Sequence, residues 1–133
     1  MDRLFLDANV LFSAAYKADA RVSRLWKLSD VVLCSSRYAL EEARANLEEE
    51  EQRQRLEQLA KTIHFLDDFT RSLPGGVSIA DKDIPILMAA VHARADYLLT
   101  GDIRHFGRYF GKKIEGVTII LPGKYLKLRK GES

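Results

Sequence analysis

The sequence of 133 residues is poor in cysteine and proline, and no apolar run approaches 18 residues. A single cysteine, Cys34, excludes an internal disulfide and a cysteine-based zinc site, and its apolar neighbours predict an inert core thiol. Without a long apolar run we expect no membrane-spanning helix. Asp2 stands where a signal peptide would be basic, so we expect a cytoplasmic protein.

Composition is that of a globular protein, with 47% apolar and 30% charged residues, and the length predicts one domain over 1–133. The formal net charge of +2 is unevenly spread. Six glutamates and one arginine lie between Glu41 and Glu51, whereas eight lysines and arginines and one acid lie between Arg104 and Lys130. The basic quarter is compatible with a phosphate-rich partner and equally with a solvated surface.

Short apolar runs alternate with helical patterns along the chain. Strands are predicted at 4–6, 31–34, 63–66, 97–100 and 117–120. Helices are predicted at 9–15, 21–28, 37–49, 52–61 and 84–95, with a loop at 74–76. Wholly apolar strands between helices indicate an α/β fold, a parallel sheet with helices on both faces.

Two predicted strands end in aspartate, Asp7 and Asp102. Ligand sites of open parallel sheets lie beyond the carboxyl ends of the strands, so neighbouring strands would bring these carboxylates together. A close carboxylate pair needs a shared proton or a cation, and oxygen ligands favour Mg²⁺ or Mn²⁺. Alone, Asp7 reads equally well as a helix N-cap and Asp102 as a turn residue.

A third acid, Asp83, precedes Ile84 and Pro85, where it is a natural N-cap that can also face a metal site. Asp81 stands two residues earlier and is the weaker candidate.

A fourth acid is expected from the helix that follows Ser36, where Glu41 and Glu42 compete. The apolar stripe places Glu41 on a solvated face with Arg37, Arg44 and Glu48. Glu42 shares a small polar side with Ala39 and Asn46 and is therefore the choice.

Four segments carry a family resemblance: 6–11 (LDANVL), 40–43 (LEEA), 81–90 (DKDIPILMAA) and 95–102 (ADYLLTGD). In this order and spacing the chain resembles the PIN-domain family over about residues 4–126. The stretch 101–107 (GDIRHFG), with Gly116, Val117 and Pro122 after it, is similar to a bacterial and archaeal subgroup.

The resemblance implies a three-layer fold with a five-stranded parallel sheet of order 3-2-1-4-5. It implies a Mg²⁺- or Mn²⁺-dependent endoribonuclease that cuts single-stranded RNA. The family's four acids fall on Asp7, Glu42, Asp83 and Asp102, and its supporting polar positions fall on Asn9 and Thr100. Many small members are VapC-like toxins inhibited by an antitoxin and often dimeric, so RNA, an antitoxin and a second copy are the expected partners.

The chain departs from some members after Asp102, where Arg104 and His105 replace a further acid. These two side chains could contact the scissile phosphate or lie in a surface loop. Tyr109, Phe110 and Tyr125 could stack on bases or belong to the core or an oligomer contact.

Three other functions compete with a toxin nuclease: a receiver module, a catalytically silent RNA-binding or interaction module, and an RNA-processing nuclease without an antitoxin. A receiver needs an acidic pair after the first strand and a lysine at the end of the last strand. Here Asp7 is single, and Lys112 and Lys113 precede the last predicted strand. The four acids argue against a silent module.

Overall fold

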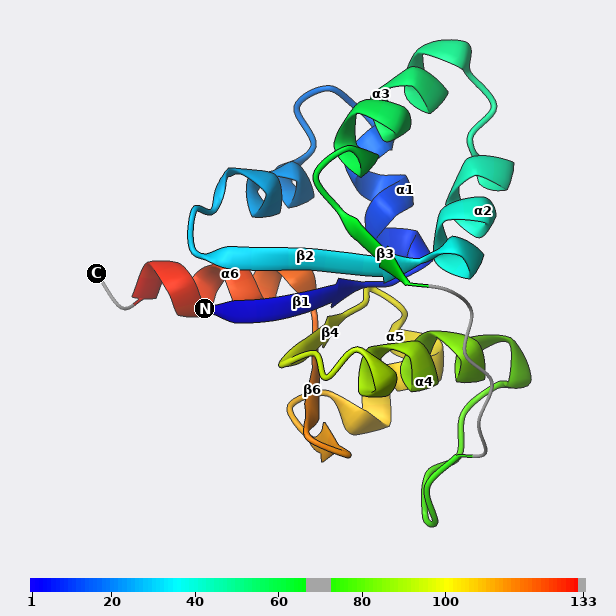
Figure 1. Ribbon diagram of the computed structural model, residues 1–133, viewed down its shortest axis with the longest axis vertical. Coiled ribbons are helices and arrows are strands. Elements are labelled where there is room, and N and C mark those ends of the chain that lie inside the picture. Colours follow the sequence, from blue (N-terminus) through cyan, green and yellow to red (C-terminus); the bar gives the residue numbers. More distant parts are fainter. Residues whose placement is uncertain (67–72, 132–133) are drawn as a thin grey trace.

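The computed structural model describes residues 1–66 and 73–131. Its first half contains β1 (Asp2–Leu6), α1 (Ala8–Tyr16), the 3₁₀ helix η1 (Arg21–Lys27), β2 (Val31–Ser36), α2 (Arg37–Asn46), α3 (Glu50–Ala60) and β3 (His64–Leu66). Its second half contains η2 (Asp81–Asp83), α4 (Ile84–His92), β4 (Tyr97–Leu99), α5 (Ile103–Phe106), η3 (Gly107–Tyr109), β5 (Lys113–Ile114), β6 (Val117–Ile120) and α6 (Pro122–Gly131). Figure 1 shows their arrangement.

Within the described residues, the six strands form one sheet in the order β3-β2-β1-β4-β6-β5. The first five strands of this order are parallel, and β1 lies at the centre between β2 and β4. Because β1 leads to β2 on one side and β4 lies on its other side, the strand order reverses at β1 and β4. The predicted order of the five parallel strands is confirmed.

A sixth strand, β5, was not predicted. It forms a short antiparallel hairpin with β6, in which Ile114 pairs with Val117. The connecting residues Glu115 and Gly116 both have positive φ angles, 51° and 87°, which is the conformation of a two-residue hairpin turn. The expected total of five strands is therefore corrected to six.

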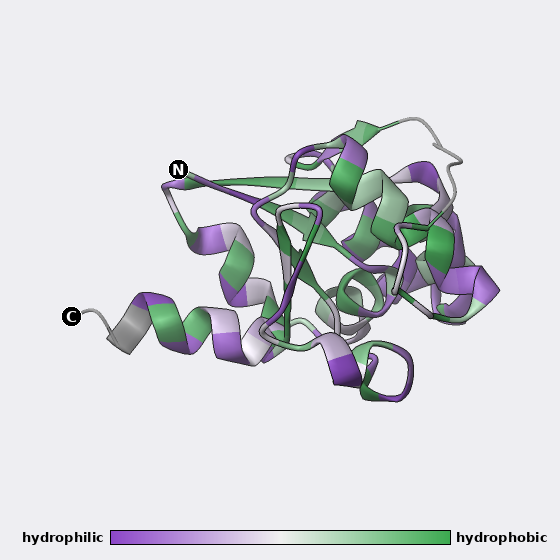
Figure 2. Ribbon diagram, turned by 90° about the horizontal axis from the view of Figure 1, so that it is seen from below, coloured by the Kyte–Doolittle hydropathy of each residue, from purple (hydrophilic) through white to green (hydrophobic). Residues whose placement is uncertain are grey.

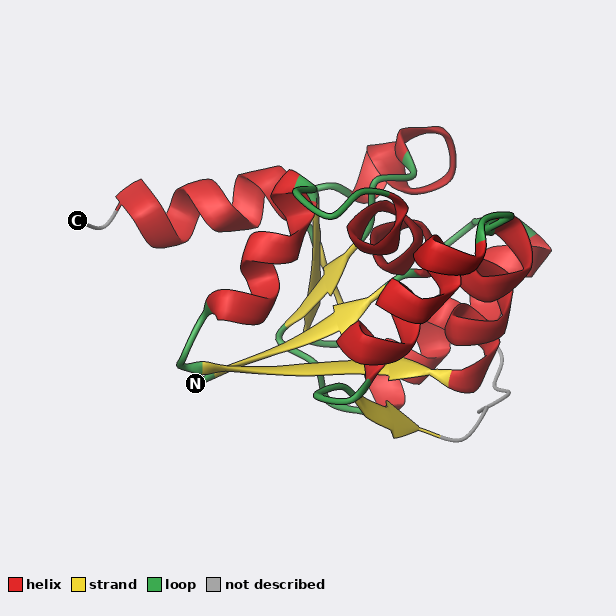
Figure 3. Cartoon of the chain, turned by 90° about the horizontal axis from the view of Figure 1, so that it is seen from above, coloured by secondary structure: helices red, strands yellow, loops and turns green. Residues whose placement is uncertain are grey.

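Helices cover both faces of the sheet, as predicted. In Figure 1, α1, α2 and α3 lie on one face, and α4 and α5 lie on the other. Figure 2 colours the strands mostly green, the colour of hydrophobic residues, and Figure 3 shows helices packed alongside the yellow strands. The second half of the central strand is fully buried, since Leu4, Phe5 and Leu6 have no exposed surface. The hydrophobic effect thus fixes the strand that carries Asp7.

Several helix ends differ from the predictions. The segment at 21–28 forms a 3₁₀ helix, Arg21–Lys27, rather than an α-helix. The helix predicted to run to 49 ends at Asn46, because Glu49 caps α3 through a capping box with Gln52. The helix predicted to run to 95 ends at His92, two residues before Arg94 adopts a φ of 56°.

Cys34 is buried in β2, and burial raises the pKa of its thiol to about 12, so it is a neutral core side chain. No helix among the described residues is long and apolar enough to cross a membrane.

Candidate active site

The site is built where the carboxyl ends of β1 and β4 meet. Leu6 pairs with Leu99, and the backbone N–H of Asp7 donates to the carbonyl of Leu99 across 3.1 Å. The two strands therefore end side by side, and the polar residues that follow them converge. This juxtaposition at the strand-order reversal is where α/β sheets hold ligands.

Asp7 is the most constrained carboxylate of the site, with 3% of its surface exposed. Its Oδ1 accepts the N–H of Ala8 at 2.6 Å, so it caps α1. Its Oδ2 accepts the hydroxyl of Thr100 at 2.7 Å and the amide of Asn9 at 3.0 Å. Burial raises the pKa of Asp7 to about 6, although the hydrogen bonds from Thr100 and from the Ala8 backbone act in the opposite direction. Asp7 therefore caps α1 and belongs to the site at the same time.

Asn9 and Thr100 brace the two strand ends. Oδ1 of Asn9 accepts the N–H of Gly101 at 2.8 Å. Oγ1 of Thr100 accepts the N–H of Asp102 at 3.1 Å while its proton goes to Asp7. A Cβ on Gly101 would lie 3.4 Å from Oδ1 of Asn9, at the close end of ordinary van der Waals contact. Both polar residues thus position acids.

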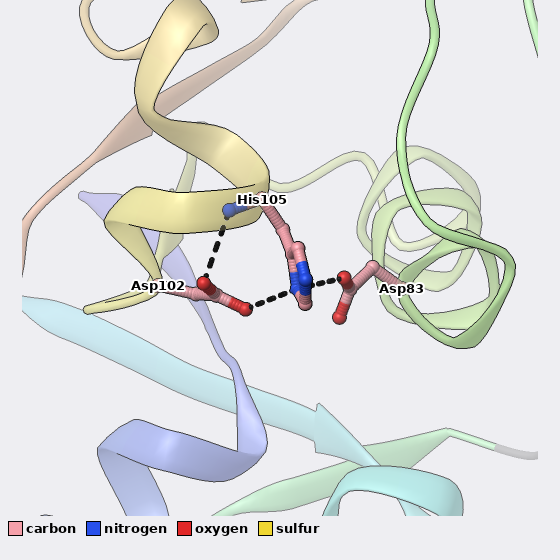
Figure 4. A group of neighbouring side chains, drawn as sticks. All are labelled: Asp83, Asp102 and His105. Atoms are coloured by element: carbon pink, nitrogen blue, oxygen red, sulfur yellow. Dashed lines mark hydrogen bonds and ion pairs between the residues drawn. The ribbon is translucent and has the colours of Figure 1, made fainter.

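A second group of polar side chains, Asp83, Asp102 and His105, links the start of α4 to α5. Nδ1 of His105 lies 2.8 Å from Oδ2 of Asp83 and 2.7 Å from Oδ2 of Asp102 (Figure 4). Neither Oδ2 of Asp83 nor Nδ1 of His105 has a hydrogen bond of good geometry, although both atoms are buried. These three side chains have the spacing of a metal-binding group.

The local conformation of Asp102 explains this geometry. Its side chain caps α5, because Oδ1 accepts the N–H of His105 at 3.1 Å. A residue three positions after an N-cap points back toward it, so the imidazole turns toward the carboxylate. Asp83 stands at the N-cap position of α4, but its side chain makes no capping hydrogen bond. Burial raises the pKa of Asp83, with Lys82 and His105 opposing.

Glu42 reaches the same place from α2. It is half-buried and lines a pocket of about 550 Å³ together with Asp7, Asp83 and Asp102. Its charge adds to the elevation of the pKa of Asp7, behind the larger effect of burial. Glu41 points away and pairs with Arg44 at 2.8 Å, with 69% of its side chain exposed. The helix places the two glutamates as the phase argument expects.

A family model of the PIN domain matches residues 3–104 of the chain, which includes every residue of this pocket. The chain belongs to the PIN-domain family.

Solved structures give the same fold. The VapBC2 structure from Rickettsia felis, bound to a DNA fragment from its promoter, has a TM-score of 0.61 and 19% identity over 88% of this chain and 96% of that one. The VapBC-1 structure from nontypeable Haemophilus influenzae has a TM-score of 0.59 and 16% identity over 91% of this chain and 98% of that one. No curated protein matches the chain in sequence.

Four candidate residues do not line the pocket of this PIN domain: Asp81, Thr100, Arg104 and His105. Thr100 is fully buried, and His105 lines a neighbouring depression. Asp81 is exposed and does not line the pocket; its carbonyl accepts the N–H of Ile84 in the turn before α4. Arg104 is also exposed and lines a neighbouring depression with Arg108. Tyr125 is 1% exposed, so it belongs to the core and the stacking alternative is wrong for it. Tyr109 is half-buried, and its hydroxyl accepts the N–H of Ser78.

The pocket of the PIN domain also includes Phe12, Ser13 and Lys82, which sequence reasoning missed, and Asn46, which it placed beside Glu42 without a role of its own. Phe12 and Ser13 follow Asn9 by three and four residues, so helix phase could have found them. Asn46 follows Glu42 by four residues on the same face of α2.

Proposed function

We propose that this PIN domain is a Mg²⁺- or Mn²⁺-dependent endoribonuclease that hydrolyses phosphodiester bonds of single-stranded RNA. One observation carries the proposal: four carboxylates from four separate segments line one pocket. They are Asp7 after β1, Glu42 on α2, Asp83 before α4 and Asp102 after β4. A fold that gathers like charges in this way is stable only with a bound cation or with protons on some of the carboxyls, and a bound cation leaves all four acids ionised.

The donor set fits a hard divalent cation. Carboxylate oxygens are the ligands that Mg²⁺ and Mn²⁺ prefer, and the buried Oδ2 of Asp83 lacks an aligned hydrogen-bond donor. Asp7, Glu42, Asp83 and Asp102 would hold the ion. A bound divalent ion supplies an activated water and neutralises the developing charge on the phosphate.

The remaining polar side chains hold the carboxylates in position. Thr100 and Asn9 donate hydrogen bonds to Oδ2 of Asp7 and thereby hold the carboxylate in one orientation before substrate binds. His105 separates Asp83 from Asp102 and offers a nitrogen that can join the ligands or donate to a phosphate oxygen.

Long-range charge supports a polyanionic substrate. The formal net charge of +2 includes the four negative charges of the site, so the remainder of the chain carries +6. A pocket whose acids are neutralised by metal therefore lies on a cationic protein that attracts RNA.

We further propose that the nuclease is the toxin of a toxin–antitoxin pair, acting in the cytoplasm as a homodimer. The support is the fold shared with the two VapBC structures. A silent RNA-binding module remains the alternative if the protein binds RNA without cutting it. An RNA-processing nuclease without an antitoxin is the alternative if it cuts RNA but its expression does not arrest growth.

The test is cleavage of end-labelled single-stranded RNA by purified protein with Mn²⁺, with Mg²⁺ and with EDTA. We expect cleavage with metal and none with EDTA. Asp83→Asn should abolish cleavage, whereas the matched control Asp81→Asn removes one exposed charge two residues away and should leave it intact. Equal activity in wild type and Asp83→Asn would mean that Asp83 takes no part in cleavage or that a contaminant cuts the RNA, and either result contradicts the proposed site. Persistence in EDTA would contradict metal dependence.

A further inference from the structure

A second cleft adjoins the acidic pocket. It lies between η1 and α6 and has a volume of about 630 Å³, within the range of roughly 300–1,000 Å³ that is typical of small-molecule and cofactor pockets. In Figure 3 these two helices lie next to each other at the side of the sheet that carries the C-terminus. Nothing in the acid-based chemistry of the site accounts for this cleft.

The cleft and the acidic pocket are continuous. Asn9, Ser13 and Gly101 line both of them. Asn9 and Gly101 are also the residues that brace Asp7 against the end of β4. A chain that passes over this shared edge therefore leaves the acids and enters the cleft directly.

The charge of the cleft is opposite to that of the pocket. Arg21 and Arg24 line it from η1, and Lys124 and Lys127 line it from α6. All four are exposed, and none forms a salt bridge with another described residue. Among the residues that the structure describes, no acidic one lines the cleft. Four unneutralised cations around one hollow are suited to bind phosphate groups.

The floor between these cations is apolar. Val10 from α1, Val22 from η1 and Leu121, Pro122 and Leu126 around the start of α6 form it. Apolar surface flanked by cations matches a nucleotide chain, whose bases have apolar faces and whose backbone is anionic. An unpaired strand can turn its bases toward such a floor, whereas a duplex keeps them stacked inside.

We propose that the η1–α6 cleft binds the single-stranded stretch of substrate that flanks the cleaved phosphodiester. The proposal rests on the proposed nuclease function and assigns its substrate-binding surface. Arg21, Arg24, Lys124 and Lys127 contact the phosphates, and the apolar floor receives a base. Cleavage and anchoring are thus divided between two adjoining hollows of opposite charge.

The experiment measures binding rather than cleavage. Fluorescence anisotropy with a labelled single-stranded RNA in EDTA gives the affinity of wild type and of Arg24→Gln/Lys127→Gln, which removes one cation from each wall. The matched control is Lys61→Gln/Arg94→Gln. It removes the same charge from exposed residues that precede β3 and β4, at the opposite end of the strands. Thermal melting verifies that both variants fold.

Salt titration makes the expectation quantitative. Each contact to a single-stranded phosphate contributes about 0.7 to the slope of log K against log salt, so the cleft variant should lose about 1.4 from that slope. At 100 mM salt this corresponds to roughly 10- to 30-fold weaker binding. The control should change the affinity less than about twofold and keep the slope.

Two results would overturn the proposal. Equal weakening in both variants would mean that overall charge alone attracts the RNA. Unchanged affinity and slope in the cleft variant would leave the cleft to an acidic protein partner. Failure of the nuclease function is separate, because it would appear as absence of metal-dependent cleavage by wild type and would not alter the binding comparison.

Discussion

Removing the charge of Asp7 should stabilise the metal-free protein. Burial, more than repulsion from Asp83 or Glu42, raises the pKa of this carboxyl from 3.8 to about 6. Because each tenfold change in proton affinity is worth about 1.4 kcal/mol, ionising Asp7 in the folded protein costs roughly 3 kcal/mol. Asp7→Asn removes that cost but exchanges one hydrogen-bond acceptor for a donor, so we expect a net gain of about 1–3 kcal/mol at pH 8.

The pH dependence has a defined sign. Below pH 3.8 the carboxyl is protonated in both states, and wild type and Asp7→Asn should differ little. Between pH 3.8 and about 6 the unfolded chain ionises first, so wild type loses stability progressively. Above the folded pKa the difference stays constant. A gain in melting temperature that grows through this window and then levels off is the expected result.

The assay is thermal unfolding in EDTA from pH 3.5 to 8, where 1 kcal/mol corresponds to roughly 3–4 °C for a chain of this length. Asp81→Asn is the control, since it removes an exposed acid and should show no difference at any pH. Mn²⁺ should raise the melting temperature of wild type and leave that of Asp7→Asn nearly unchanged. A less stable Asp7→Asn at pH 8 would refute the reasoning and make the carboxylate chiefly a structural anchor.

Three further predictions test single side chains, two of them with a matched control substitution. Glu42→Gln should lower the cleavage rate, and extra Mn²⁺ should partly restore it. Glu41→Gln should change the rate less than about twofold, because the exposed ion pair of Glu41 contributes only about 0.3–0.5 kcal/mol. If a Mn²⁺ titration gave the reverse pattern, the assignment of the two glutamates to their helix faces would be wrong. Thr100→Val should lower the free energy of unfolding in urea by about 2 kcal/mol and reduce cleavage, because the Thr100 hydroxyl donates a hydrogen bond to Asp7 and accepts one from Asp102. Thr100→Ser keeps the hydroxyl and should retain both stability and cleavage. Equal behaviour of the two variants would show that the hydroxyl does not position Asp7. Tyr125→Phe should cost about 1 kcal/mol of stability through its lost hydrogen bond without affecting cleavage rate, and a loss of cleavage would contradict its assignment to the core.

The parallel strands could be predicted because their signal is local. The apolar runs at β1, β2, β4 and β6 are short, strong and bounded by polar residues. The β5 strand gave no such signal, since it has two residues and depends on the positive φ of Glu115. The end of α2 was predicted too late because Glu49 forms the capping box of α3 and therefore cannot belong to α2. Helix periodicity alone does not show which of two consecutive helices such a residue joins.

The acids of the pocket could be predicted for a different reason. Asp7 and Asp102 end strands that a parallel sheet must align, so topology brings them together. The position of His105 could not be read in the same way, because it depends on Asp102 capping a helix of only four residues. The signal was nevertheless present: an N-cap residue and a side chain three positions later face each other.

Stability without metal and affinity for metal are expected to oppose each other at this site. Burying Asp7 beside Asp83 and Glu42 destabilises the metal-free fold, and a bound cation would relieve the same electrostatic cost. By linkage, the free energy that is lost in the metal-free protein adds to the metal's preference for the folded state. A variant that folds better without metal should therefore bind metal more weakly. The apolar run of β1 made this strand recognisable in the sequence. The burial that the same run creates around Asp7 is thus also the physical origin of the metal dependence that we propose.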